Sequence, residues 1–170
     1  MAAIKQHVIG ANLTVKRMTV KDVHRCWELD RRCFTDGEAY DLDTFHYLLT
    51  NPDAVTRKVE HQADMMIGFA IGMIEPGAVG HVISVAVAPE WRRRGIGTLL
   101  MAEIERDFIR RNATIARLEV RVANVIAQQL YLRLDYVITQ QIPNYYSNGD
   151  DALVMVKSLP QRRSFWRLIY

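Results

Sequence analysis

A pair of glycines beside three arginines is the feature of this sequence with the clearest chemical meaning. The run R-R-R-G-I-G-T places together Arg92, Arg93, Arg94, Gly95, Ile96, Gly97 and Thr98. Glycine has no Cβ, so a ligand can come within hydrogen-bonding distance of the backbone. Arginine is a permanent cation whose planar head can fork onto phosphate oxygens. These residue types at this spacing favour the binding of a phosphate or a diphosphate.

The residues on either side of this loop predict a strand before it and a helix after it. A run rich in β-branched residues ends before Pro89, and apolar residues recur at helical spacing at Ile96, Leu99, Leu100, Ile104 and Phe108. The first turn of such a helix presents unpaired N–H groups and partial positive charge, which suit a phosphate. Two other phosphate loops are excluded, because a dinucleotide fingerprint requires a third glycine where Leu100 stands and a P-loop requires Gly-Lys-Ser/Thr.

Two motifs resemble those of a known enzyme family. The pattern R-x-x-G-x-G, formed by Arg92, Gly95 and Gly97, resembles the coenzyme A pyrophosphate loop of the GCN5-related N-acetyltransferase (GNAT) superfamily. The block L-E-V-R-V-A-N-V-I-A-Q-Q-L-Y-L-R-L-D-Y, residues 118–136, is similar to the protein N-terminal acetyltransferases of that superfamily, the branch of the ribosomal-protein-alanine and archaeal enzymes. With G-H-V-I-S-V-A-V before the loop and Y-Y-S-N-G-D-D-A-L near the end, the resemblance covers roughly residues 13–157.

The same resemblance contains one departure. Asp135 stands where such enzymes usually have a glycine, directly before an aromatic residue. We therefore expect the turn between helix and strand to have a different shape there.

The resemblance implies acetyl-CoA as co-substrate and assigns its contacts. Strand residues Val85, Ala86 and Val87 would pair with the pantetheine arm as an added strand does, and the loop of arginines and glycines would hold the pyrophosphate. Asn124 would hydrogen-bond the cofactor, and Tyr131 would lie beside the thioester sulfur. The residues alone leave plainer interpretations open: Val85 and Val87 as core strand, Asn124 as a helix cap, and Tyr131 as a core aromatic.

The resemblance also assigns the groups that move protons. His81 and Glu119 fall where a base would accept the proton of the amine, and Glu38 on the first loop is a third candidate. His81 and Glu119 could equally be a pair of polar groups without a catalytic role. Tyr131 is predicted to protonate the leaving sulfur, because a phenol with a pKa of about 10 lies within roughly two units of a thiol.

Direct attack by the amine is preferred over a covalent enzyme intermediate, because neither cysteine belongs to the matched site. The backbone N–H near Val87 is predicted to face the carbonyl oxygen that gains charge during the transfer.

Two loops are predicted to hold a peptide N-terminus, Glu38-Ala39-Tyr40 and Asn144-Tyr145-Tyr146. Aromatic rings with a hydroxyl tip can hold a peptide backbone and leave the choice of side chain open. An α-amino group has a pKa of about 7.7 to 8.0 against about 10.4 for lysine, so a modest base suffices for it. We therefore predict transfer to protein or peptide N-termini, with ribosomal proteins as candidate targets.

Two other functions stay open from the sequence. One is acetylation of a small amine such as a polyamine or an antibiotic, which would use the same donor site. The other is a non-catalytic acyl-CoA-binding module that regulates a partner. The tyrosines of the two loops favour the peptide over the small amine, and Tyr131, His81 and Glu119 argue against a module without activity.

The remaining sequence supplies elements that would position these residues. Expected strands are 13–18, 55–60, 65–75, 80–87, 116–122, 136–142 and 152–157. Expected helices are 19–30, opened by a capping box of Thr19 and Asp22, then 44–50, 96–111 and 123–134. Early strands follow one another and later strands alternate with helices. We therefore predict an α/β (α+β) protein with the GNAT fold, a single mixed sheet of about seven strands with helices on both faces.

Length and composition set the remaining bounds. The 170 residues fit one domain, predicted as a loose segment 1–12, an acetyltransferase domain 13–159 and a basic, aromatic tail 160–170. A formal net charge of +3 does not by itself imply nucleic acid. Without a membrane-spanning apolar run or an export signal, the prediction is a cytoplasmic protein. Cys26 and Cys33 are predicted to be buried thiols, with no metal site.

Overall fold

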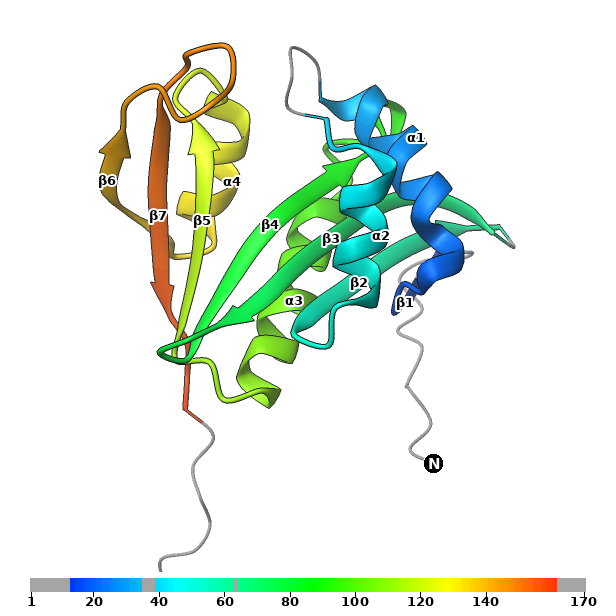
Figure 1. Cartoon of the computed structure of the whole chain (residues 1–170), viewed down its shortest axis with the longest axis horizontal. Coiled ribbons are helices and arrows are strands. Elements are labelled where there is room, and N and C mark those ends of the chain that lie inside the picture. Colours follow the sequence, from blue (N-terminus) through cyan, green and yellow to red (C-terminus); the bar gives the residue numbers. More distant parts are fainter. Residues whose placement is uncertain (1–12, 35–38, 63, 162–170) are drawn as a thin grey trace, which may run out of the picture.

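A computed structural model describes residues 13–34, 39–62 and 64–161 of the chain. Its strands and helices, in chain order (Figure 1), are β1 (Leu13–Lys16), α1 (Val23–Cys33), α2 (Leu42–Thr50), β2 (Ala54–His61), β3 (Met65–Glu75), β4 (Val79–Val87), α3 (Ile96–Arg110), β5 (Ile115–Arg121), α4 (Val125–Arg133), β6 (Val137–Ile142) and β7 (Ala152–Ser158). The predicted segment 1–12 lies outside the described residues. So does the predicted tail 160–170, except for Pro160 and Gln161.

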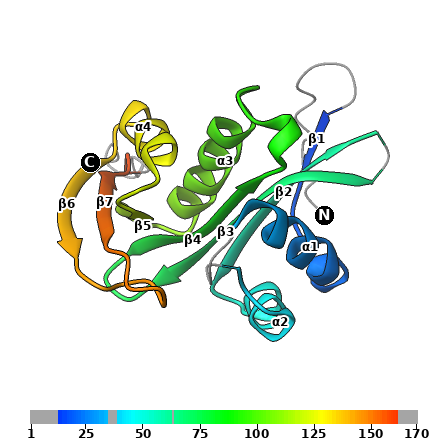
Figure 2. The ribbon, with the colours of Figure 1, turned by 90° about the horizontal axis from the view of Figure 1, so that it is seen from above.

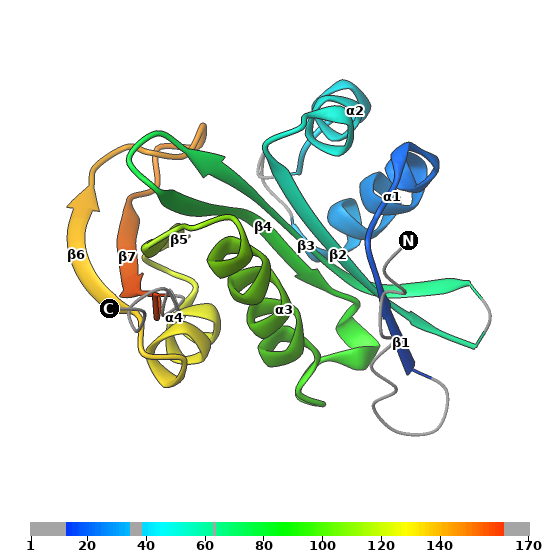
Figure 3. The same cartoon turned by 90° about the horizontal axis from the view of Figure 1, so that it is seen from below.

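The strands form one seven-stranded sheet in the order β1-β2-β3-β4-β5-β7-β6. Neighbours pair antiparallel except β4 and β5, which are parallel. Seen from above, β1 and β6 lie at the two edges of the sheet (Figure 2). Helices α1 and α2 cover one face and α3 and α4 the other (Figure 3). The predicted mixed sheet with helices on both faces is confirmed.

The two parallel strands at the centre of the sheet separate along their length. β4 pairs with β5 only from Val79 to Val82. The register between β3 and β4 shifts at Ile71, which leaves Ile83 of β4 without a partner in β3. Such a bulge bends a strand and disrupts its ladder, and beyond it β4 and β5 diverge (Figure 1). The sheet therefore opens at its middle instead of at an edge.

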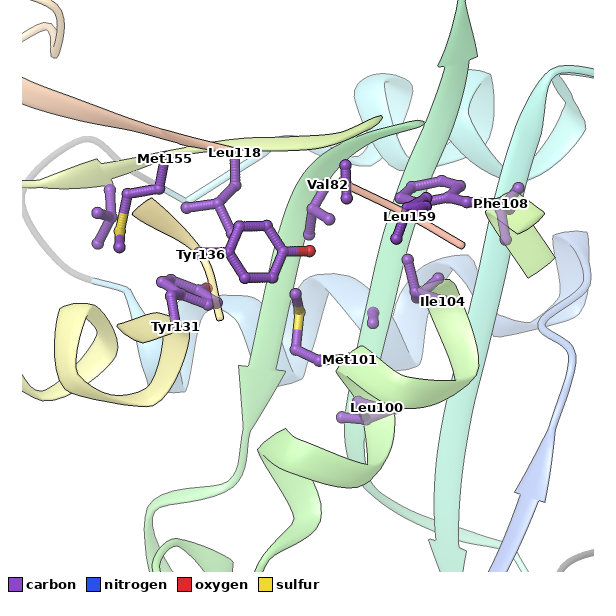
Figure 4. Packing of buried hydrophobic residues seen from close by; sticks show 14 of the residues in the cluster. Val82, Leu100, Met101, Ile104, Phe108, Leu118, Tyr131, Tyr136, Met155 and Leu159 are labelled. Carbon is purple, nitrogen blue, oxygen red and sulfur yellow. The ribbon is translucent and has the colours of Figure 1, made fainter. Parts of the chain in front are cut away.

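The larger hydrophobic core lies between the sheet and α3 with α4. Buried residues of α3, among them Leu100, Met101 and Ile104, face Val82 and Leu118 of the two central strands (Figure 4). The ring of Phe108 fills a place where the sheet has only glycines: a Cβ at Gly72 or Gly80 would lie 2.4 or 2.3 Å from that ring. This packing brings α3 directly against the sheet and fixes where its N-terminus begins.

Most predicted boundaries differ from the structure by one or two residues, and the first helix differs more. The predicted capping box exists, with the Thr19 N–H donating to Asp22 Oδ2 at 2.8 Å, but it opens a short 3₁₀ turn that leads into α1. α1 continues to Cys33, three residues beyond the predicted Asp30. Cys26 is buried as predicted, whereas the prediction was wrong for Cys33, which is half-buried.

The expectation of a different turn at Asp135 was also wrong. Asp135 has a φ of 66°, a left-handed conformation that glycine favours and aspartate tolerates. The N–H of Tyr136 donates to the carbonyl of Tyr131 at 3.0 Å, and that of Asp135 to Leu132 at 3.1 Å. These two bonds form the Schellman ending that usually carries a glycine. The turn after α4 thus keeps a regular shape with aspartate in it.

Candidate functional site

A pocket of about 130 Å³ lies where β4 and β5 diverge. Its lining comes from β4, β5, α4 and the loops above them: Phe34, Tyr40, Val82, Ile83, Ser84, Val85, Leu118, Glu119, Val120, Arg121, Asn124, Ala127, Tyr131 and Tyr146. Of the residues predicted for the donor, Val85, Asn124 and Tyr131 line it, and of those predicted for the acceptor, Tyr40 and Tyr146 line it. Glu119 lies between the two sets, and Glu38 lies outside the described residues.

The edge of β4 beyond the bulge presents backbone groups to this opening. The N–H of Ala88 donates to Ile67 of β3 at 2.9 Å. Because successive residues of a strand point their amides to opposite sides, Val87 and Val85 direct theirs away from β3, while Ala86 directs its own toward β3. The Val87 carbonyl accordingly accepts from a group outside the sheet, the Nε of Arg92, at 3.1 Å. Val85 and Val87 are thus placed for backbone pairing with an extended ligand, and Ala86 is not.

The side chains of Val85 and Val87 also fit, in part, the plainer interpretation of these residues as core strand. Both are half-buried and pack against the larger core. A strand residue can do both, because its side chain stands perpendicular to the direction of its backbone hydrogen bonds.

The loop of arginines and glycines precedes α3 as predicted. Arg93 and Gly95 have φ values of 61° and 79°, and a Cβ at Gly95 would meet no atom within 4 Å. Gly95 is the N-cap of α3 and has no side chain to occupy the N–H groups of the first turn. Ile96 is buried and fixes the helix start, while Thr98 is exposed. The open backbone and uncapped helix end give the loop the geometry that a diphosphate requires.

Arg92 and Arg94 each contact an uncharged group beside the loop. Arg92 donates to the Val87 carbonyl, and the Arg94 guanidinium lies 4.9 Å from the centre of the Trp91 ring. Trp91 in turn packs against His61 with 4.6 Å between ring centres. Neither contact neutralises an arginine, so positive charge stays beside the N-terminus of α3.

His81 and Glu119 meet, as predicted, on the face of the sheet that α1 and α2 cover. His81 Nε2 lies 2.6 Å from Glu119 Oε2, and His81 Nδ1 lies 2.8 Å from Oε1 of Glu75. Exposed fractions of the side chains are 17% for His81, 9% for Glu119 and 33% for Glu75. The His81 imidazole is therefore held between two carboxylates, of which Glu119 also lines the pocket.

Burial and pairing shift the pKa values of this pair in opposite directions. Burial alone would lower the pKa of His81, but hydrogen bonds and charge from Glu119 and Glu75 outweigh it and raise that pKa. Burial alone would raise the pKa of Glu119, but its hydrogen bond with His81 and the charges of His81 and Arg117 lower it. Both shifts favour an imidazolium beside a carboxylate.

Tyr131 lies at the inner wall of the pocket, 9% exposed, with its ring centre 5.9 Å from that of Tyr136 (Figure 4). It is both a core aromatic and a pocket residue. Burial raises the pKa of Tyr131 to about 12, above the ordinary phenol value on which the prediction rested. The phenol therefore keeps its proton at neutral pH, so it is available as a proton donor and not as a base, but it is a weaker acid than the prediction assumed.

Asn124 is the N-cap of α4, and its Oδ1 accepts a hydrogen bond from the Ala127 N–H at 3.1 Å. The plainer interpretation as a helix cap is thus correct. Because Asn124 is exposed and lines the pocket, its side-chain NH₂ group is the part that could contact a cofactor.

Two anchors fix the loops that carry the predicted acceptor tyrosines. The Tyr40 N–H donates to Oδ2 of the buried Asp30 at 2.8 Å. On the other loop, Arg121 is paired with Asp150 and lies 4.6 Å from the ring centre of Tyr146. The Tyr145 ring packs edge-on against Tyr146 at 5.1 Å. Burial raises the pKa of Tyr145, and the charge of Glu119 adds to this, so the Tyr145 ring lies within the field of the His81 cluster.

Sequence reasoning missed Glu75, Asp30 and Arg121. Glu75 could have been found, because it directly precedes the Pro76-Gly77 turn and a hairpin through that turn places it near His81. Asp30 gave no signal, since a helical aspartate is usually solvated. The described residues contain no group of three or more potential metal ligands, and none of their helices is long and apolar enough to cross a membrane.

Comparison with known proteins finds relatives of this chain among acetyltransferases. Residues 23–136 match the model of the acetyltransferase (GNAT) family. An uncharacterised N-acetyltransferase of Methanocaldococcus jannaschii is 38% identical over 152 residues, 89% of this chain and 95% of that protein. An N-alpha-acetyltransferase of Saccharolobus solfataricus is 40% identical over 84 residues, 47% of this chain and 48% of that protein. The structure of Arabidopsis thaliana NAA60 in complex with acetyl-CoA aligns with a TM-score of 0.77 at 17% identity, covering 86% and 98% of the two chains.

Proposed function

Because the chain belongs to the acetyltransferase (GNAT) family and takes acetyl-CoA as its acetyl donor, we propose that it transfers acetyl directly to the N-terminal α-amine of a protein or peptide. The observation that carries this proposal is the set of residues that line the pocket where β4 and β5 diverge. Groups assigned to the donor, to the proton transfer and to a peptide acceptor all line the same pocket.

Backbone groups of β4 and the positive charge beside α3 support the binding of acetyl-CoA on the donor side. The outward amide of Val85 would pair with the pantetheine arm, which leaves the Val87 N–H for the thioester, and the N-terminus of α3 with Arg92, Arg93 and Arg94 would hold the pyrophosphate. When bound, acetyl-CoA supplies the activated thioester carbonyl. The Val87 N–H would donate to its oxygen as negative charge develops there.

Glu119 and His81 would act together as the acceptor of the amine proton. Glu119 reaches the pocket, and His81 lies behind it at hydrogen-bonding distance. About a tenth of an α-amine is already neutral at pH 7, so a base of modest strength is sufficient. The role of Glu38, the third predicted base, stays a prediction.

Tyr131 would give its proton to the sulfur that leaves. Its hydroxyl is protonated up to pH values far above neutral because of burial, and it lines the same pocket as Glu119. The amine loses one proton to the Glu119–His81 pair, and the sulfur gains one from Tyr131. The transfer therefore needs no covalent bond between the acetyl group and the enzyme.

The acceptor half favours a peptide over a small polycation. The tyrosines Tyr40 and Tyr146 line it, with Tyr145 beside them, and the charge of Glu119 is compensated by His81. A polyamine site would require acidic groups without such partners. The N-alpha-acetyltransferase relative supports the same choice. Ribosomal proteins as targets and a cytoplasmic location stay predictions.

The proposal is tested with purified protein, isotope-labelled acetyl-CoA, a panel of short peptides and spermidine. We expect label on peptides, and a Tyr131→Phe variant that binds acetyl-CoA normally but turns over at least tenfold more slowly. Tyr136→Phe is the matched control, because Tyr136 is a buried neighbour that does not line the pocket. Turnover of spermidine alone would remove the peptide claim, and acetyl-CoA binding without any turnover would favour a regulatory module.

A further inference from the structure

Glu75 is held in the site, yet no step described above uses it. It ends β3, directly before the hairpin turn. In the hairpin Met73 lies opposite His81, so Glu75 is the diagonal neighbour of His81 on the same face of the sheet. Its Oε1 lies 2.8 Å from His81 Nδ1. Glu75 does not line the pocket, so it does not act on a substrate directly, and its shortest contact toward the pocket is the one with His81.

The two contacts of the His81 ring, with Glu75 and with Glu119, need one proton more than a neutral histidine provides. A neutral imidazole has one N–H, and an ionised carboxylate only accepts hydrogen bonds. Contacts at 2.8 and 2.6 Å on the two ring nitrogens therefore require a proton on each nitrogen or on one carboxyl group.

Arg117 decides which of these alternatives is favoured. Its guanidinium lies 3.3 Å from Oε1 of Glu119 and 3.8 Å from Oε2 of Glu75. This charge helps to lower the pKa of Glu119, which leaves the extra proton on the imidazole and not on that carboxyl group. The other titratable group that faces the cluster is Tyr145, from the loop between β6 and β7. The geometry of the cluster therefore fits its protonated form, in which His81 is a cation between Glu75 and Glu119. At a pH above the pKa of His81 the cluster lacks that proton and can accept one.

We propose that Glu75 is a positioning residue for the acetyl transfer: it orients His81 toward Glu119 and stabilises the imidazolium that forms when the pair takes up the proton of the acceptor amine. The proton leaves the amine nitrogen, enters at Glu119, which faces the pocket, and comes to rest on His81 between the two carboxylates. His81 later releases it to solvent and Tyr131 takes a proton back from solvent, so the charges balance over one turnover. This inference rests on the proposed function for its role in catalysis.

Glu75→Gln is the informative variant, because the amide oxygen of glutamine can still accept the Nδ1 hydrogen bond while the negative charge is lost. We expect the acidic limb of the pH profile of kcat/KM to move to lower pH by about one unit, the usual effect of losing a neighbouring charge. Because a weaker base accepts protons less readily, the plateau should fall about tenfold. Glu75→Asp keeps the charge and should retain the position of the limb.

The control is Glu28→Gln, the same change at an exposed position of α1, which should leave both the limb and the plateau as in the native protein. An equal loss of activity at all pH values in Glu75→Gln would mean a merely structural role and overturn the proposal.

A second measurement does not depend on turnover. The pH titration of the His81 ring, followed by NMR in histidine-labelled protein and assigned with His81→Gln, should move to lower pH in Glu75→Gln. An unchanged titration overturns the proposal even if the enzyme is active. If no peptide is acetylated but the titration moves, the proposed function fails while the coupling of Glu75 to His81 stands.

Discussion

Asp30 of α1 and Tyr40 are joined by a hydrogen bond of 2.8 Å from the Tyr40 N–H to Asp30 Oδ2. Asp30 is fully buried, and Tyr40 lines the pocket. The pairing links the core under α1 to the loop expected to hold the acceptor. A buried carboxylate is retained only where its partners compensate the loss of water, so this contact ties the backbone before α2 to α1.

The first prediction concerns this anchor. Asp30→Ala removes the acceptor and should raise the KM for peptide several-fold, while the Kd for acetyl-CoA stays unchanged, because the donor lies on the other side of the pocket. Asp43→Ala, at an exposed position of α2, is the control. Steady-state kinetics and calorimetry check it, and equal losses for peptide and acetyl-CoA would contradict it.

The second prediction separates the two glycines of the loop. Gly95 has a φ of 79°, so Gly95→Ala should lower the free energy of unfolding by about 1 to 2 kcal/mol. Gly97 lies in α3, where a Cβ would meet only the side chain of Leu130 at 3.2 Å. Gly97→Ala should leave stability equal or higher, because alanine is the better helix former, yet weaken acetyl-CoA binding by at least tenfold.

Thermal unfolding and calorimetry test both variants together. A Gly97→Ala protein that binds acetyl-CoA as tightly as the native protein would show that the ligand's diphosphate does not approach the backbone there.

The third prediction separates two roles of Asn124, as the N-cap of α4 and as a contact of acetyl-CoA. Asn124→Asp keeps an oxygen for the Ala127 N–H and should retain stability, whereas Asn124→Ala should cost about 1 kcal/mol as lost N-caps do. Both remove the NH₂ group, so both should weaken acetyl-CoA binding. Chemical denaturation and calorimetry provide the two readouts, and full affinity in Asn124→Asp would leave Asn124 as a cap only.

The fourth prediction is a pH dependence of stability. The raised pKa of His81 stabilises the fold below its ordinary value of 6.5 and ceases to do so as pH rises through the folded value. The lowered pKa of Glu119 stabilises above 4.5 and ceases as pH falls. The loss in His81→Gln should therefore be largest between these values and smaller at pH 9, as measured by denaturation at each pH. A loss independent of pH would contradict the pairing.

Much of the sheet could be predicted from sequence because its signals are local. β3 was predicted with its observed bounds from apolar residues between two turns, and the helix after the glycines from its periodicity. The roles of His81 and Glu119 were inferred from the resemblance, and the two side chains are in contact, although only Glu119 lines the pocket.

Features that depend on distant contacts were missed. The bulge at Ile83 that opens the sheet is set by pairing with β3, and nothing in the run V-I-S-V-A-V marks it. α1 continues past Asp30, whose buried carboxylate accepts a hydrogen bond from the Tyr40 N–H ten residues further on. Glu75 escaped notice because a glutamate beside a turn is usually solvated, and only the register of the hairpin brings it to His81.

The most direct test of the central claim uses one peptide that has both a free N-terminus and an internal lysine, incubated with the purified protein and labelled acetyl-CoA. Fragment-ion mass spectrometry then locates the label. We predict that it lies on the α-nitrogen and that Glu119→Gln reduces its rate of appearance at least a hundredfold. Label confined to the lysine side chain, or no label under conditions in which acetyl-CoA binds, would contradict the assignment.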